Sequence, residues 1–114
     1  MNNLNGINEK LAEGGFLKRL NIEKRLIDNW YYLDLEILLS CDANYSKDFA
    51  LIKFYNVQEL SMENINPILA IQFAIYNKSD CQLENTNFYV CDEENDTFSF
   101  YCERITFNDE SIIH

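Results

Sequence analysis

Residues 33–41 have the sequence Leu-Asp-Leu-Glu-Ile-Leu-Leu-Ser-Cys. Every second residue from Leu33 to Cys41 is apolar, and three of the four residues between them are polar. Successive side chains of a β-strand point to opposite faces, so this period of two predicts a strand with one face in a core and the other toward water. The stretch therefore predicts a fold built on a β-sheet.

Further strand-like segments lie on the C-terminal side of this stretch. We expect strands over residues 49–57, 58–63 (a weak strand or a bulged extension), 69–76, 86–91 and 98–107. The last two segments flank a polar turn at residues 92–97, which predicts a β-hairpin. Pro67 ends the second segment, because proline is tolerated only at a strand start or a sheet edge.

The N-terminal part has a different pattern. Residues 7–13 suit a short helix that ends at the glycine pair after Glu13. In residues 16–29 the apolar positions fall near helical spacing with basic residues between them, and we expect a helix there, although the same positions also fit a strand. Residues 1–6 are polar, and we expect them to fray.

These patterns together predict an α+β fold. We expect a single domain over residues 1–114, in which a helical region at 7–29 precedes an antiparallel sheet at 30–107. The sheet is expected to be mostly antiparallel with five to six strands, accompanied by one or two N-terminal helices.

The charge of the chain is strongly acidic. Nineteen acidic residues against nine basic residues give a net charge of −10. Residues 1–30 carry a net +1, and residues 31–114 carry −11. Such a field repels nucleic acid and anionic membranes and attracts basic proteins, so we expect no nucleic-acid or membrane partner. The alternative is that the acidity only keeps the protein soluble.

The chain shows no secretory signal at its N-terminus and no apolar stretch of about 20 residues, so we expect a cytoplasmic protein. Its four cysteines are therefore expected to be free. If Asp92 lies opposite Thr97 in the hairpin, Cys91 and Cys102 share a face but lie about 13 Å apart at ~3.3 Å per residue. A disulfide requires Cα atoms within about 7 Å, so these two cysteines are not expected to pair.

Catalytic groups are scarce. The single histidine, His114, is the last residue, so neither a histidine acid–base pair nor an activated cysteine is expected. The chain has no glycine-rich phosphate loop, no zinc motif and no complete calcium loop. We therefore expect no enzymatic activity, no cofactor and no metal; a small hydrolase that uses two carboxylates is the alternative left open.

The remaining candidate function is binding to another protein. Carboxylates at the predicted hairpin turn and in the loop before it form an acidic projection, and three tyrosines nearby supply the rigid aromatic contacts that binding hot spots favour. The predicted partner-binding residues are Asp92, Glu93, Glu94, Asp96, Asp80, Glu84, Tyr76, Tyr89 and Tyr101.

Four segments carry a resemblance to a known group of proteins. They are Trp-Tyr-Tyr-Leu-Asp-Leu-Glu-Ile at 30–37, Ile-Lys-Phe-Tyr-Asn-Val-Gln-Glu-Leu at 52–60, Tyr-Val-Cys-Asp at 89–92, and Phe-Ser-Phe-Tyr-Cys-Glu-Arg-Ile at 98–105. The second contains a Phe-x-x-Val-x-x-Leu element. Over residues 30–107 the chain resembles small bacterial immunity proteins of polymorphic-toxin and contact-dependent growth inhibition systems.

This resemblance implies a cytoplasmic antitoxin. Such proteins neutralise one cognate toxin domain, very often a nuclease, by tight binding over its active site, and they carry no catalytic residue. We therefore expect an immunity protein whose acidic side chains occlude the active site of a basic toxin. The alternative is a non-enzymatic partner- or ligand-binding β domain whose acidity serves solubility.

Overall fold

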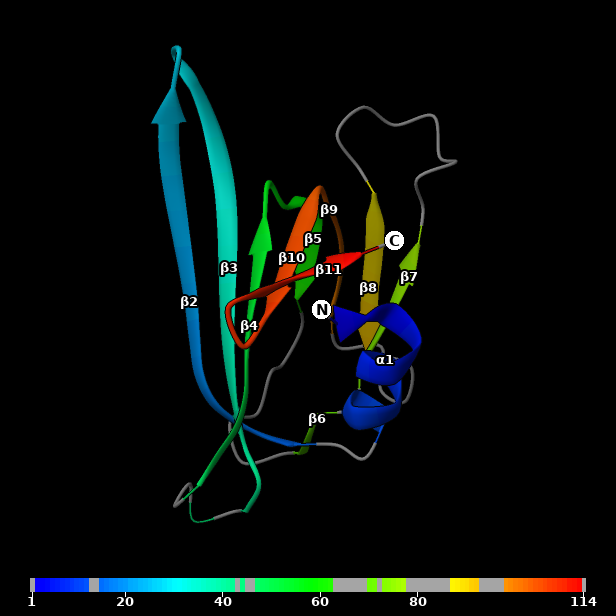
Figure 1. Ribbon diagram of the computed structural model, residues 1–114. Helices are drawn as coiled ribbons and strands as arrows, with labels where there is room; N and C mark the ends of the chain where they lie inside the picture. Colours follow the sequence, from blue (N-terminus) through cyan, green and yellow to red (C-terminus); the bar gives the residue numbers. More distant parts are fainter. Residues whose placement is uncertain are drawn as a thin grey trace.

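The computed structural model describes residues 2–12, 15–42, 44, 47–62, 70–71, 73–77, 87–92 and 98–113 (Figure 1). In chain order the elements of this part are β1 (Asn2–Asn3), α1 (Leu4–Ala12), β2 (Gly15–Ile27), β3 (Trp30–Ser40), β4 (Asp48–Tyr55), β5 (Gln58–Met62), β6 (Ala70–Ile71), β7 (Phe73–Asn77), β8 (Phe88–Asp92), β9 (Phe98–Cys102), β10 (Arg104–Phe107) and β11 (Glu110–Ile113).

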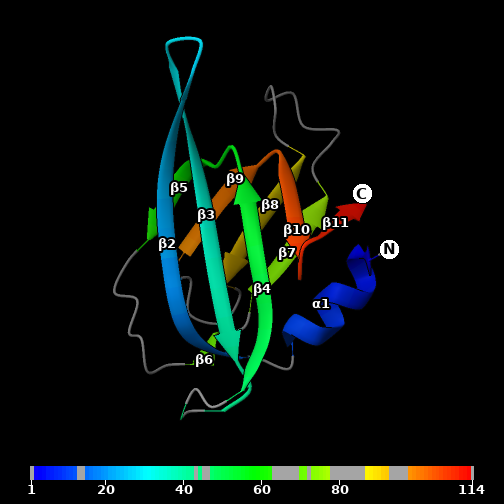
Figure 2. The ribbon, with the colours of Figure 1, turned by 60° about the vertical axis from the view of Figure 1, so that its left-hand side comes forward.

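The strands form two sheets that face each other (Figure 2). Within the described residues, one sheet has seven strands in the order β1-β11-β10-β4-β3-β2-β6, and the other has four in the order β5-β9-β8-β7. All pairs are antiparallel except β1 with β11. The prediction of a mostly antiparallel fold with an N-terminal helix is confirmed, but the prediction of a single sheet of five to six strands is wrong.

One hydrophobic core lies between the sheets. The seven-stranded sheet contributes alternate residues of β3, β4 and β10, and the four-stranded sheet contributes alternate residues of β8 and β9, as expected for two inner faces that interdigitate. Phe54 from β4 meets Phe100 from β9 edge to face, with ring centroids 4.9 Å apart. Ile7 and Leu11 of α1 join the same core.

Two neighbouring segments cross from one sheet to the other, which explains why the expected strand at 98–107 is divided into β9 and β10 and why the expected strand at 49–57 ends at Tyr55 as β4. β4 leads into β5 through Asn56 and Val57, and β9 leads into β10 through Glu103. Asn56 has a positive φ of 56°, and its side-chain amide donates a hydrogen bond of 3.0 Å to Glu103. This pair fixes the corner at which both chains change sheet.

Residues 16–29 form no helix, contrary to our expectation. They lie mostly in β2, which pairs with β3 along its whole length through a two-residue turn at Asp28 and Asn29. Both turn residues have positive φ, 51° and 63°, as the tight hairpin turn preferred by Asn and Asp requires. Three of the four basic side chains of this segment bind carboxylates on β3 or β4 instead of covering a helix: Lys18, for example, lies 2.9 Å from Asp48 of β4.

The single helix of the described residues, α1, begins at Leu4, so residues 4–6 are helical and Asn2–Asn3 form β1 where we expected a frayed segment. Asn8 docks the helix on the edge strand β7. Its amide donates to the carbonyl of Ile75 at 2.8 Å and accepts from the Ile75 N–H at 2.9 Å. The side chain thus satisfies backbone groups that an edge strand otherwise leaves unpaired.

The β8–β9 hairpin differs from the predicted register by one residue. Cys91 pairs with Ser99 and Phe88 with Cys102. This register places the apolar residues of both strands on one face, toward the core, whereas the predicted register divides them between two faces. Cys102 is therefore buried and Cys91 faces outward, and neither of them forms a disulfide, nor does Cys41. Cys81 lies outside the described residues.

In the part of the chain described by the structure, no helix is long and apolar enough to cross a membrane.

Candidate partner-binding surface

The three predicted tyrosines come together on the outer face of the four-stranded sheet. Tyr76 of β7 pairs with Tyr89 of β8, which pairs with Tyr101 of β9. Their ring centroids lie 6.4 Å and 4.9 Å apart in turn. Side chains directly opposite each other on antiparallel strands are neighbours, so this pairing makes a continuous aromatic row. Tyr76 is the exposed member of this row.

Of the predicted acidic projection, only Asp92 lies within the described residues. Asp92, its first residue, ends β8 with only 4% of its surface exposed, so it does not belong to an exposed tip. In the β7–β8 register it lies opposite Phe73. The other predicted acidic residues, Asp80, Glu84, Glu93, Glu94 and Asp96, lie outside the described residues.

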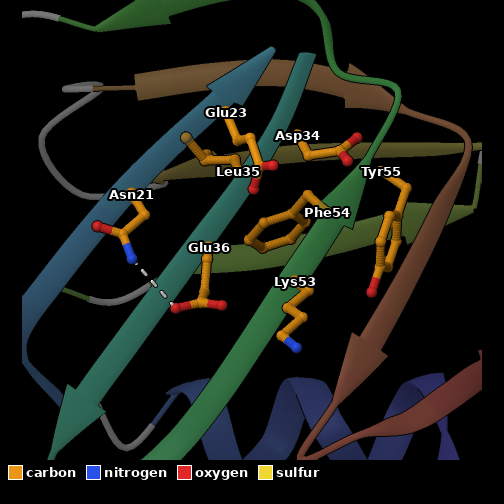
Figure 3. Close-up of a pocket in the computed structure, with 8 residues that line it drawn as sticks. All are labelled: Asn21, Glu23, Asp34, Leu35, Glu36, Lys53, Phe54 and Tyr55. Carbon is orange, nitrogen blue, oxygen red and sulfur yellow. Dashed lines mark hydrogen bonds between the residues drawn. The ribbon is translucent and has the colours of Figure 1, made fainter. Parts of the chain in front are cut away.

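A polar surface covers the outer face of the other sheet, where β2, β3 and β4 run side by side. A pocket of about 200 Å³ opens here, and Figure 3 shows its lining. The lining residues are Asn21, Glu23, Asp34, Leu35, Glu36, Lys53, Phe54 and Tyr55.

The carboxylates of this pocket hold the strands together. Glu36 accepts hydrogen bonds from Arg19 at 2.9 Å and from Asn21 at 3.3 Å, both on β2. Lys53 lies opposite Glu36 in the β3–β4 register. A carboxylate hydrolase needs one acid that is free to hold or release a proton. The hydrogen bonds that Glu36 and Asp34 accept favour a structural rather than a catalytic role for these two carboxylates.

Asp34 links three segments of the seven-stranded sheet. Its carboxylate accepts two hydrogen bonds from the Arg25 guanidinium, one of them 3.1 Å long, and one from the backbone N–H of Asn56 at 3.1 Å. The hydrogen bond to Asp34 is the main cause that raises the pKa of Arg25 above its ordinary value. Asp34 therefore fixes the β2–β3 hairpin to the corner between β4 and β5.

Beyond this link the hairpin carries a cluster of exposed apolar side chains. We call it the apolar tip, and it consists of Leu26, Ile27, Trp30 and Tyr31, which are 43–68% exposed. We did not predict this surface, because residues 16–29 were expected to form a helix. The signal in the sequence is the Asp28-Asn29 turn with large apolar residues on both sides, where polar residues are usual.

The described residues contain no group of three or more His, Cys, Asp or Glu side chains that could hold a metal ion.

The model of the immunity protein PIM8 family matches residues 1–108 of the chain. The chain belongs to the PIM8 immunity protein family. The match includes the N-terminal segment as well as the region on which the sequence resemblance rested, and it confirms that resemblance. No curated protein and no solved structure matches this PIM8 protein significantly. Immunity proteins protect the cell that makes them against a toxin, so the functional surface of a PIM8 protein is expected to be one that binds a protein.

Proposed function

We propose that this protein is the antitoxin of one cognate bacterial toxin domain and that it acts in the cytoplasm as a stoichiometric inhibitor rather than as an enzyme. The observation that carries the proposal is membership of the PIM8 immunity protein family over residues 1–108. The absence of an internal histidine from the sequence agrees with an inhibitory role.

We further propose that the toxin domain is basic and is a nuclease of a polymorphic-toxin or contact-dependent growth inhibition system. A net charge of −10 supports this part. An enzyme that cleaves nucleic acid needs a positive surface to hold phosphates, and carboxylates on the inhibitor can occupy the same surface. Opposite charge also speeds the encounter of the two proteins, which matters when a toxin must be captured quickly.

The test of the inhibitory role is co-expression with the toxin domain encoded by the neighbouring gene. We expect cells that express both proteins to grow, and cells that express the toxin domain alone to stop growing. With purified proteins, we expect a one-to-one complex and loss of toxin activity when the ratio reaches one. Normal toxicity in the presence of the folded protein contradicts the proposal.

The part played by the acidic residues is tested separately. Glu93→Lys and Glu9→Lys change the net charge equally, but only Glu93 belongs to the predicted acidic projection, while Glu9 lies exposed on α1. If the projection faces the toxin, Glu93→Lys weakens binding and Glu9→Lys has a much smaller effect. Equal, small effects of both substitutions favour the alternative that acidity serves only solubility.

A further inference from the structure

The β2–β3 hairpin extends well beyond the rest of its sheet (Figures 1 and 2). β4 pairs with β3 only from Leu35 to Ser40, so residues 23–34 form a two-stranded ribbon in the described structure. A two-stranded ribbon gains little stability from its own contacts. A long ribbon with exposed apolar side chains at its end therefore adds little to the stability of the protein, which indicates that its tip serves binding.

Both faces of this ribbon end in apolar side chains. Leu26 pairs with Tyr31, and these residues continue the face that carries Leu35 into the core. Ile27 pairs with Trp30 on the opposite face. Since the second sheet does not extend over the ribbon, the core-side face is exposed once it passes the end of β4 (Figure 2). The apolar tip is thus an extension of the core face with no sheet opposite it.

The base of the ribbon is held firmly. Asp34 binds Arg25 across the two strands and the N–H of Asn56, and the N–H of Val57 donates to the carbonyl of Leu33 at 2.7 Å. A groove of about 750 Å³ lies beside this base, lined by residues 30–33 of the ribbon and residues 56–59 of the corner. The structure therefore presents the tip and the groove as one preorganised surface, which lowers the entropy lost on binding.

The two most exposed residues of the apolar tip are aromatic. Tryptophan and tyrosine are enriched among the residues that contribute most to protein–protein binding, because they bury a large area with few rotatable bonds. Trp30 and Tyr31 are the most exposed large apolar residues of the described chain, at 68% and 67%.

The charge of the protein decides which of two possible partners the apolar tip binds, a second copy of this chain or a different, basic protein. A second copy also carries −10, so two copies repel each other when their tips approach. A basic partner is attracted, because among the described residues around the tip and its groove the exposed carboxylates of Glu23, Asp28 and Glu59 outnumber the one exposed ammonium, that of Lys24, while Arg25 is paired with Asp34. An apolar centre with an acidic border matches an apolar cleft with a basic border.

We propose that the apolar tip is the anchor by which this immunity protein holds its toxin domain, with Trp30 and Tyr31 entering an apolar cleft that basic side chains of the toxin surround. The inference rests on the proposed function and adds the binding surface to it. The anchor lies on the seven-stranded sheet, whereas the tyrosine row lies on the four-stranded sheet.

The test compares Trp30→Ala with Tyr55→Ala, which removes an aromatic side chain of β4 outside both the apolar tip and the tyrosine row. We measure the Kd of each purified variant for the toxin domain encoded by the neighbouring gene, and the protection of co-expressing cells. We expect Trp30→Ala to raise the Kd roughly 30-fold or more, as for a binding hot spot. Tyr55→Ala should change the Kd less than about threefold, and Trp30→Phe should recover much of the affinity.

A second measurement does not depend on variants. Trp30 is the only tryptophan of the chain, so fluorotryptophan incorporated into this protein alone gives a single fluorine NMR signal from the tip. We expect this signal to shift when the toxin domain is added, and its solvent exposure to fall. An unchanged signal in a formed complex overturns the inference.

Two other results also overturn it. The first is a wild-type complex that Trp30→Ala leaves intact and Tyr76→Ala disrupts. The second is a dimer of this protein alone that Trp30→Ala converts to monomers, which assigns the tip to a second copy. A wild-type protein that neither binds nor protects is a different outcome: it refutes the proposed function, and this inference with it.

Discussion

Arg25 and Asp34 lie diagonally across the β2–β3 hairpin, and Nη2 of Arg25 donates a hydrogen bond of 3.1 Å to Oδ1 of Asp34. The same carboxylate oxygen accepts the N–H of Asn56 at 3.1 Å. One acidic side chain therefore joins the two strands of the ribbon and ties them to the corner where the chain changes sheet. We expect the ribbon to lose its fixed position when this carboxylate is removed.

Asp34→Ala is expected to lower the free energy of unfolding by about 1–3 kcal/mol, because it leaves a guanidinium and a partly buried N–H without their acceptor. The matched control is Asp48→Ala, which removes the exposed ion pair with Lys18 and should cost less than about 1 kcal/mol. Urea denaturation of both variants measures the difference. Similar losses in the two variants contradict a special role for Asp34.

Phe100→Ala is expected to cost about 3–5 kcal/mol, since the ring is fully buried and meets Phe54 of the other sheet. Tyr76→Ala, on the outer face, should cost far less because its side chain is already partly in water. Thermal unfolding followed by circular dichroism reports both. A small loss for Phe100→Ala means that the two sheets do not share a packed core.

The cysteines are expected to differ in reactivity. Burial raises the pKa of the Cys102 thiol, so this group stays protonated in the folded protein. Because the thiolate is the reactive form, a protonated thiol is alkylated slowly. Cys41 is exposed to the reagent. Alkylation at pH 8 followed by peptide mass spectrometry should therefore modify Cys41 in the native protein and Cys102 only after unfolding.

The same shift predicts how stability changes with pH. The raised pKa of Cys102 means that the unfolded chain releases this proton at a lower pH than the folded protein. Its contribution to stability is complete below the unfolded pKa of about 8.5 and falls as the pH rises above it. Cys102→Ala should remove that part of the loss, and urea midpoints compared at pH 7 and pH 10 measure it. An identical pH dependence in both proteins contradicts the assignment.

Association with the toxin domain is expected to slow as salt is added, because a charge of −10 attracts a basic partner mainly over long range. The apolar tip acts at short range, so the dissociation rate should change little between 0.05 M and 0.5 M salt. Stopped-flow and surface-binding measurements separate the two rates. An association rate that does not change with salt removes electrostatic steering from the mechanism.

The sequence alone determined the positions of several strands, because their pattern is local. The alternation of residues 33–41 predicted β3 and its core residues Leu35, Ile37 and Leu39, although Leu38 and Ser40 on the other face are also buried and Cys41 is exposed. The segments 86–91 and 98–107 carry the same signal. The acidity of the chain and the lack of an internal histidine are also fully present in the sequence, and they pointed to a binding function before the family match supported an immunity role.

Tertiary structure decided which strands pair, which side chains become neighbours and which side chains stay exposed, because local sequence patterns do not contain this information. Residues 16–27 lack a clear period of two because much of β2 lies outside the core, and only its pairing with β3 makes it a strand. Tyr76, Tyr89 and Tyr101 became neighbours through strand register, and Asp92 was buried by the same register. The apolar tip depends on β3 being longer than its partner β4. The exposure of a side chain depends on the element that packs against it, and the sequence of one segment does not specify that element.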